Sequence, residues 1–530
     1  MLILQIYNKC WWFDKHFVYE SLVSLNYRFS ILLVDVTIML YMHERQSRKK
    51  ELARRIFVYA LMTVTMLTLL VLLTYRILGY QFNFLTRSVE RTGLIQYDSF
   101  PRGARVQVDG KKYELTKTKN MVLPGERQFS MSLEGYHDWQ KTLKIEAGTV
   151  TWLSYVRLVP TEKQITNTDN LGALKDAKNS PDSRYIFGMR STETGFEEVL
   201  IDVRDSKLPK VTVYPLDTAN LTGFEEGQEV SHEFSVVRWD VSSRRVLLKH
   251  SYAGAVSGSE WLWVDRENPE KVVNISTLTN LAIKDIRPAK DGEVYILQDN
   301  GDVRRLVVET GTISRPLVSN VISYGVYSTN TIYYVATQID GQRVAGVWRD
   351  GWDTPTVIQT IPADTSPVQI AISQYFYQDT VAIAHGASVT IYRGELPSNA
   401  QERAELVAEP FDTFTLNRPV GSLQISSNGR FVVAEDERGF VSYDLELSSI
   451  SQQVRKYRND AVRWLDEYHV WQVNDSGTLM MQEFDGVNTY ELMPANASYD
   501  VLLTQDGKYI YGFVKNETGA VELVQLAMTI

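Results

Sequence analysis

The feature that most constrains this chain is one apolar run, Ile56–Tyr75, which holds twenty consecutive residues without a charge, a glycine or a proline. An α-helix rises about 1.5 Å per residue, so the run covers the roughly 30 Å hydrocarbon core of a bilayer. A much longer and more polar stretch follows it. The sequence therefore predicts one transmembrane helix at 56–75 that anchors one large body. A buried core helix is disfavoured because basic residues crowd one end of the run.

The charges beside the run predict its orientation. Basic residues cluster before it, whereas only Arg76 follows it until Arg87. Positive flanks stay in the cytoplasm, so we expect a cytoplasmic N-terminus and an extracytoplasmic C-terminal body on the cell membrane. The run is longer than the apolar part of a cleaved signal peptide, and no A-x-A-like site follows it. We expect an uncleaved, single-pass signal anchor.

Residues 1–55 are expected to be a cytoplasmic segment, but their start is ambiguous. Met42 opens a basic stretch that is typical of the beginning of a signal anchor. One interpretation is that the true start lies near Met42 and that residues 1–41 are an artefact of start-site assignment. The other is that these residues, with Trp11 and Trp12, form an amphipathic segment on the membrane surface.

Charge and cysteine content limit the function of the body. The chain has 55 basic and 64 acidic residues, of which 9 and 5 lie in residues 1–75, so residues 76–530 carry a net charge of −13. A net acidic body argues against nucleic-acid binding. Because the only cysteine is Cys10, the body has no disulfide, and its stability must come from a large core. A cysteine-free exported body favours a bacterial source.

After a juxtamembrane linker at 76–91, residues 92–160 predict a small β-sandwich of five or six strands. Short alternating segments are separated by turn residues, such as Asp109-Gly110 after the segment 105–108. An Asp-Gly pair accepts the positive φ angles of a tight hairpin. Gly103 is likewise expected in a turn, and Trp139 in the core.

The motifs of this segment resemble the PEGA domain. The resemblance rests on Phe100-Pro101-Arg102-Gly103-Ala104, Val106-Gln107-Val108-Asp109-Gly110-Lys111, Leu123-Pro124-Gly125, Gly135-Tyr136 and Leu158-Val159-Pro160. The chain departs from the family by having Arg102 in place of glutamate, and by a degenerate turn at 114–117. The resemblance implies a spacer or adhesion module of a surface protein, without catalysis.

Residues 161–530 show a recurrent unit, in which a polar turn precedes a strand rich in Tyr, Val and Ile. Eight units follow one another at steps of 38 to 60 residues, and they begin at Ser180, Asp240, Ala289, Tyr327, Phe376, Ser426, Trp464 and Thr504. A period in the forties with about four strands a unit is typical of a β-propeller, because radial packing covers both apolar faces of each sheet. We predict eight blades, or seven if the long first step hides irregular structure. A β-solenoid requires shorter repeats.

The turn sequences 180–185 and 506–509 resemble the WD-like repeats of TolB-like propellers and of the propeller domains of prolyl-oligopeptidase-type peptidases. This resemblance implies a fold and no function. A peptidase of the second type also needs a G-x-S-x-G elbow, which the sequence lacks.

The sequence offers no catalytic, cofactor-binding or metal-binding residue. The histidines of the body have no metal-ligand spacing, and they are His137, His232, His250, His385 and His469. The acidic stretch 299–302 lacks the terminal glutamate of a calcium loop and is expected to be a hairpin turn. The tryptophans at 261, 263, 348 and 352 are expected in the core of the sheets rather than on a glycan platform.

Three functions fit this organisation. The favoured one is a non-enzymatic binding or scaffold protein of the cell envelope, whose propeller meets an envelope protein, a peptide or a cell-wall polymer. The alternative is a propeller-based glycan-active or other hydrolytic or lyase enzyme, with carboxylates from distant blades at the central channel. The third is a sensory partner subunit, which the short cytoplasmic segment disfavours.

Overall fold

The computed structural model describes residues 48–530, except 78, 84–87, 194, 225–228, 290–291, 339, 398–401, 403–408 and 458–460. The expectations for residues 1–47, including the two tryptophans and the start at Met42, lie outside the described residues. The chain divides into two compact units, Met1–Thr92 and Gly93–Ile530. The described part is mainly β-structure.

The first unit contains the helix α3 (Arg48–Ile77) and the strands β1 (Tyr80–Asn83) and β2 (Ser88–Arg91). Its segment Lys50–Tyr75 is long and apolar enough to cross a membrane, has a peak mean hydropathy of 2.5 and is not buried by protein. The helix begins before the predicted span because the basic flank continues it. Threonine hydroxyls donate to carbonyls of the preceding turn, as from Thr68 to Val64 at 2.8 Å, so these polar groups are satisfied in apolar surroundings.

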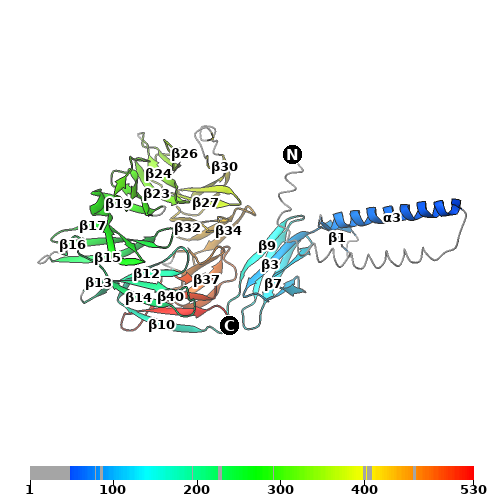
Figure 1. The fold of residues 1–530 in the computed structure, drawn as a ribbon, viewed down its shortest axis with the longest axis horizontal. Coiled ribbons are helices and arrows are strands. Elements are labelled where there is room, and N and C mark those ends of the chain that lie inside the picture. Colours follow the sequence, from blue (N-terminus) through cyan, green and yellow to red (C-terminus); the bar gives the residue numbers. More distant parts are fainter. Residues whose placement is uncertain are drawn as a thin grey trace. The chain divides into compact units, whose positions relative to one another are not determined.

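Residues 93–157 form a module of two packed sheets (Figure 1). In the first sheet, β3 (Gly93–Phe100) lies between β6 (Thr118–Val122) and β9 (Val150–Arg157). The second has the order β5 (Lys111–Leu115), β4 (Arg105–Val108), β7 (Gly125–Ser132) and β8 (Trp139–Ile145).

The core of this module forms between the two sheets, around the fully buried Tyr97, Phe129 and Trp139. The turn glycines Gly103 and Gly110 have φ angles of 91° and 76°, as the hairpin sequence predicts. The sequence did not predict β5 and β6, because both are mainly polar and show no clear alternation; β5 is largely exposed, and β6 is mostly half-buried.

The remaining strands form eight four-stranded antiparallel sheets within the described residues. Sheet 1 contains β11 (Leu174–Asn179), β12 (Tyr185–Thr192), β13 (Gly195–Asp202) and β14 (Lys210–Pro215). Sheet 2 contains β15 (Val230–Trp239), β16 (Arg245–Gly254), β17 (Gly258–Asp265) and β18 (Asn268–Asn274). Sheet 3 contains β19 (Ile283–Pro288), β20 (Glu293–Gln298), β21 (Val303–Val307) and β22 (Thr312–Ile313). Sheet 4 contains β23 (Val321–Tyr327), β24 (Thr331–Thr337), β25 (Arg343–Arg349) and β26 (Thr356–Ile361).

The next three sheets repeat this order. Sheet 5 contains β27 (Val368–Tyr375), β28 (Gln378–His385), β29 (Ser388–Gly394) and β30 (Pro410–Thr415). Sheet 6 contains β31 (Ser422–Ile425), β32 (Phe431–Asp436), β33 (Gly439–Asp444) and β34 (Ser449–Val454). Sheet 7 contains β35 (Arg463–Trp464), β36 (His469–Val473), β37 (Thr478–Glu483) and β38 (Tyr490–Pro494).

Sheet 8 joins the two ends of this region. Its strands β39 (Leu502–Leu503), β40 (Tyr509–Lys515) and β41 (Val521–Ala527) come from the C-terminal end, and β10 (Ile165–Gly172) comes from the beginning. β10 pairs with β41 in antiparallel fashion, with Ile165 opposite Leu526. Loss of this pairing would leave β10 unpaired, whereas β41 would keep its pairing with β40.

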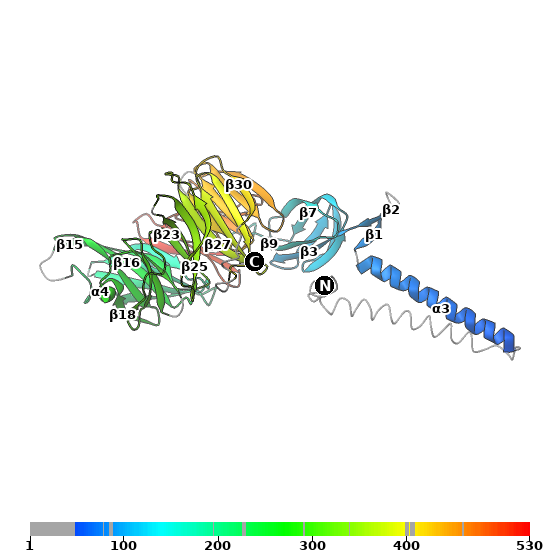
Figure 2. The same cartoon turned by 90° about the horizontal axis from the view of Figure 1, so that it is seen from above.

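Buried apolar clusters connect each sheet to the next. Eight clusters join consecutive sheets, and one of them joins sheet 8 to sheet 1 through Tyr511, Phe513 and Ile186. Each sheet is therefore covered on both faces, which a single twisted sheet requires. The tryptophans at 261, 263, 348 and 352 are buried in these clusters, as predicted. The short helix α4 (Ile275–Thr279), which the sequence analysis did not predict, packs on sheet 2 (Figure 2).

The recurrent turns have a common physical basis. All eight lie between the first and second strands of their sheets. In the clearest copies a hydroxyl donates to the acidic or amide side chain two residues later, as from Ser426 Oγ to Asn428 Oδ1 at 2.7 Å. The same hydroxyl accepts the backbone N–H of Phe431 at 3.0 Å. The repeat is clearest in the sequence where a hairpin uses this pair of side chains, as at Ser180, Ser426 and Thr504.

Candidate functional site: a cleft between sheets 1 and 2

Two of the five histidines of the body, His232 and His250, lie in contact in the structure, although their spacing in the sequence did not indicate this. His232 on β15 and His250 on β16 lie with Nδ1 and Nε2 2.9 Å apart. The Nδ1 atom of His250 lies 2.8 Å from Oε1 of Glu260 on β17. His385 and His469 instead bind Asp364 and Asp466, and His137 lies beside the Tyr490 ring at a tilt, with 5.6 Å between ring centroids.

Sheet pairing explains this arrangement. His250 on β16 has two direct cross-strand partners, which are Glu260 on β17 and Phe234 on β15. Paired residues share one face of a sheet, so these side chains all point towards sheet 1. The predicted turn at Asp240 fixes the register of β15 and β16 only as far as Arg238. A bulge between Val236 and Arg238 then shifts the pairing by one residue, so the turn alone did not signal the pairing of Phe234 with His250.

The Glu260 carboxylate also holds the connection between the two sheets. It accepts the backbone N–H and the hydroxyl of Thr222, each at 3.0 Å, and the side-chain amide of Asn274 at 2.9 Å. Burial alone would raise the pKa of Glu260, but the bonds from His250, Asn274 and Thr222 lower it. The carboxylate therefore stays ionised and fixes residues around 222 against sheet 2.

Aromatic rings surround the histidine pair. Phe224 stacks on His232 with 3.9 Å between ring centroids, and Phe234 stacks on His250 at 4.3 Å. Burial lowers the pKa of His232, and the neighbouring His250 lowers it further. The ring of His232 also hydrogen-bonds to the backbone of Gly223. The hydrogen-bond chain from Glu260 thus ends on the backbone of the connecting loop.

An open cleft of about 550 Å³ lies beside this network. Sheet 1 and sheet 2 both contribute to its lining, which consists of Lys175, Met189, Arg190, Ser191, Phe196, Ser231, His232, Glu233, Phe234, Ser251, Tyr252 and Ala253. The lining mixes aromatic rings, hydroxyl groups and charges of both signs. Seven polar or charged residues and five apolar or aromatic ones line the cleft, so a ligand in it would meet both kinds of group.

Glu198 on β13 lies beside two residues of this lining. It is the cross-strand partner of Met189, and it shares a face of β13 with Phe196. The side chain is fully buried, and neither carboxyl oxygen has a hydrogen-bond partner among the described residues. Burial raises the pKa of Glu198 to about 8, so the carboxyl is mostly neutral at pH 7. A buried, unpaired carboxyl is costly and needs a reason.

Across the described residues, no group of three or more His, Cys, Asp or Glu is placed to hold a metal ion. The stretch 299–302 forms the turn between β20 and β21, as expected. Within the described residues, the two histidines beside the cleft bond to each other and to Glu260 rather than to a serine.

A second buried group of charges lies where the module meets sheet 7, and we call it the module junction. Lys141 of β8 is buried, with Nζ 2.6 Å from Glu483 Oε2 and 2.8 Å from Asp485 Oδ2. The hydroxyl of Tyr155 lies 3.0 Å from the same ammonium, and Trp139 Nε1 donates to Glu483. Burial alone would lower the pKa of Lys141, but Tyr155, Glu483 and Asp485 together raise it.

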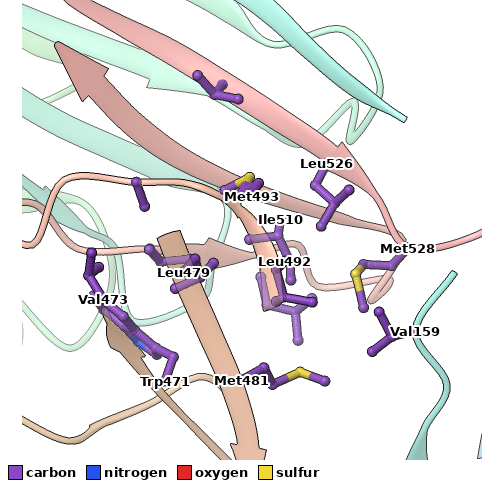
Figure 3. Close-up of a cluster of buried hydrophobic side chains, with 14 residues drawn as sticks. Val159, Trp471, Val473, Leu479, Met481, Leu492, Met493, Ile510, Leu526 and Met528 are labelled. Carbon is purple, nitrogen blue, oxygen red and sulfur yellow. The ribbon is translucent and has the colours of Figure 1, made fainter. Parts of the chain in front are cut away.

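The junction extends to sheet 8. Arg157 of β9 binds the Asp466 carboxylate at 3.1 Å and donates to the carbonyl of Gly507 at 3.2 Å. Burial alone would raise the pKa of Asp466, but His469 and Arg157 hold it well below its usual range. Val159 joins the apolar cluster of sheets 7 and 8, close to Met528 (Figure 3). Polar and apolar contacts therefore hold the module on these two sheets.

The strand pattern and turns of the module can now be compared with known families. Residues 92–162 match the PEGA domain. The PEGA module departs from the motif at Arg102, which lies on the surface 3.3 Å from Asp98, so the change leaves the core unaffected.

A comparison with curated proteins finds no match. Among solved structures, the computationally designed Ika8 protein is 11% identical with a TM-score of 0.40, over 68% of this chain and 99% of that chain. A chain of the Mitotic Checkpoint Complex is 11% identical with a TM-score of 0.35, over 53% of this chain and 84% of that chain. Likenesses at these scores support no conclusion on fold or function.

Proposed function

We propose that this chain is a membrane-anchored, extracytoplasmic binding protein whose eight sheets are the blades of one β-propeller. The clusters between consecutive sheets support this architecture, because they run from sheet 1 to sheet 8 and back to sheet 1. The pairing of β10 with β41 supports closure of the ring. A closed ring removes exposed sheet ends and gives a rigid frame for loops.

The observation that carries the proposal is the module junction. A buried ammonium between two carboxylates is stable only if all three partners stay in place. The PEGA module and the propeller therefore behave as one body, in which the module is a spacer and the propeller presents a surface. Such a rigid display serves recognition of an envelope protein, a peptide or a cell-wall polymer.

The placement outside the cell is tested by cysteine labelling, because Cys10 is the only cysteine of the chain. A Cys10→Ser, Leu208→Cys variant carries one thiol at a position that is 70% exposed. In intact cells, a membrane-impermeant maleimide is expected to label the thiol of this variant. The wild-type chain, whose thiol is Cys10, is expected to be labelled only after the cells are permeabilised. Labelling with the opposite pattern would reverse the orientation.

The binding role is tested by photo-crosslinking in living cells. A photoreactive amino acid at Tyr252 samples the cleft, and one at Leu208 samples the outer part of sheet 1 as a control. We expect Tyr252 to capture an envelope protein, peptide or wall fragment that Leu208 does not capture. Equal capture, or none from either position, would contradict a specific binding surface there.

An acid–base enzyme is the second candidate. The line of Glu260, His250 and His232 favours it, because such a line can orient a general base. The enzyme candidate is weaker than the binding protein, because the hydrogen-bonded line ends at the backbone of Gly223 and not at a group that could react. The test is whether the protein turns over envelope glycans or peptides. Turnover that is lost in His250→Gln, while this variant still binds its ligand, would favour an enzyme.

A further inference from the structure

The cleft between sheets 1 and 2 faces away from the PEGA module. The module contacts the turns between first and second strands, at Asp466 in sheet 7 and Gly507 in sheet 8. The cleft residues Arg190 and Tyr252 lie near the turns between second and third strands. In an antiparallel sheet these turns lie at opposite ends of the strands. In the propeller proposed above, the cleft is thus free of the spacer.

The floor of the cleft is apolar. Phe196 and Phe234 lie with ring centroids 4.7 Å apart, and Met189 lies in the same apolar cluster. A thioether side chain adapts its shape to what it contacts. This floor suits an apolar or aromatic side chain of a ligand.

The rim carries charges of both signs. Lys175 of sheet 1 is exposed and forms no ion pair within the described part of the chain, while Glu233 of sheet 2 is exposed in the same lining. The Arg190 guanidinium adds no free charge to this rim, because it lies on the other face of β12, where Glu197 holds its Nε at 2.6 Å. A rim of this kind matches a ligand with an anionic and a cationic group.

A buried carboxyl group without a hydrogen-bond partner among the described residues, that of Glu198, lies behind the apolar floor of the cleft. Glu198 adjoins Met189 and Phe196 on the same face, and its two oxygens lack partners among the described residues. Because the carboxyl is shielded from water, a donor group of a ligand that reaches past Met189 would satisfy it. An amine or amide N–H is such a donor. Three serine hydroxyls in the lining offer further bonds to a peptide backbone.

We propose that this cleft binds a short peptide with free termini and an apolar side chain. The side chain packs on Phe196 and Phe234, Lys175 binds the carboxylate, and Glu233 binds the ammonium group. This inference rests on the proposed binding function and specifies its ligand. A peptide fits better than a neutral glycan, because a glycan uses neither rim charge.

Three probes separate these contacts: the dipeptide Ala-Phe, its C-terminal amide, and its N-acetyl form. Binding is measured by calorimetry with the full chain in lipid nanodiscs. We expect Ala-Phe to bind best. Lys175→Gln should weaken Ala-Phe and its N-acetyl form by about fivefold and leave the amide unchanged, because one partly exposed ion pair is lost. Glu233→Gln should weaken Ala-Phe and its amide and leave the N-acetyl form unchanged.

The matched control is Lys144→Gln, which removes an exposed lysine of β8 and should change no affinity. No saturable binding of any probe up to about 10 mM would overturn the proposal. So would saturable binding of chitotriose without binding of the peptides, which would assign the cleft to a glycan.

The photo-crosslinking experiment separates the two claims. Capture at Tyr252 without dipeptide binding contradicts the peptide inference and leaves the binding protein in place. Dipeptide binding that Lys175→Gln does not weaken also contradicts the inference. Absence of both capture and dipeptide binding contradicts both claims.

Discussion

Lys141 and Glu483 form a buried ion pair, with 2.6 Å between Nζ and Oε2, that joins the PEGA module to sheet 7. The two residues are 342 positions apart in the chain. Both charges of the pair are buried away from water. The pair therefore stabilises the fold only while Asp485 and Tyr155 also stay in contact with Lys141.

Replacing Lys141 by Met should therefore destabilise the unit Gly93–Ile530 by about 3–5 kcal/mol, because Glu483 is left charged and buried. Chemical denaturation measures the free energy of unfolding. Adding Glu483→Gln should recover much of the loss. The control is Arg102→Ala, which breaks an exposed pair and should cost about 0–1 kcal/mol. Equal effects of the two single variants would show that the junction is not a buried charge cluster.

The buried Glu198 predicts a decline in stability with rising pH. Its pKa is raised from 4.5 to about 8 in the folded chain, so the folded state binds the proton more tightly than the unfolded state. This contribution is complete below pH 4.5 and is lost as pH rises towards 8. Glu198→Met should remove the decline and stabilise the protein at pH 8 by roughly 1–3 kcal/mol.

Glu197→Gln is the matched control, because the neighbouring Glu197 points to the other face of β13 and pairs with Arg190. It should leave the decline between pH 5 and 8 intact. Unfolding curves at pH 5, 6.5 and 8 measure the effect. A wild-type decline that survives in Glu198→Met would assign it to another group.

His232 predicts a change of the opposite sign. Its pKa is lowered from 6.5, chiefly by burial, so the folded state binds the proton more weakly than the unfolded state. Its contribution is present above pH 6.5 and is lost as pH falls through the folded pKa. His232→Gln should reduce the loss of stability below pH 6.5. An NMR titration of the ring that gives a pKa above 6.5 would be inconsistent with this environment.

The hairpin between β27 and β28 predicts a gain in stability. Phe376 and Tyr377 have φ angles of 48° and 61°, and their side chains are 66% and 87% exposed. Bulky residues rarely adopt such angles, whereas an Asn-Gly pair favours them. Phe376→Asn with Tyr377→Gly should raise the free energy of unfolding by about 1–2 kcal/mol. A loss of stability would mean that the exposed rings make contacts that outweigh the backbone strain.

The sequence predicted the parts of the structure that depend on local patterns. The apolar run predicted a helix that can cross a membrane, and the hydroxyl–Asx turns at Ser180, Ser426 and Thr504 predicted where hairpins form. The PEGA motifs predicted a module at 92–160, and residues 92–162 match that domain. These features need only neighbouring residues, so a single sequence contains them.

The cleft and the junction could not be predicted in the same way. His250 meets Glu260 and His232 through strand register, and Lys141 meets Glu483 through the packing of distant segments. Glu198 looks like any charged residue of a strand until its burial is known. Contacts across sheets depend on how segments far apart in the sequence pack together, which no local pattern specifies.

The central claim is that the PEGA module and the eight sheets form one rigid body that presents the cleft. The most direct test places spin labels at Lys112→Cys and Leu208→Cys in a Cys10→Ser chain held in nanodiscs. Pulsed electron paramagnetic resonance then measures the distribution of distances between the two labels. The account predicts one narrow distance distribution, which broadens in Lys141→Met. A broad distribution in the otherwise unaltered protein would contradict it.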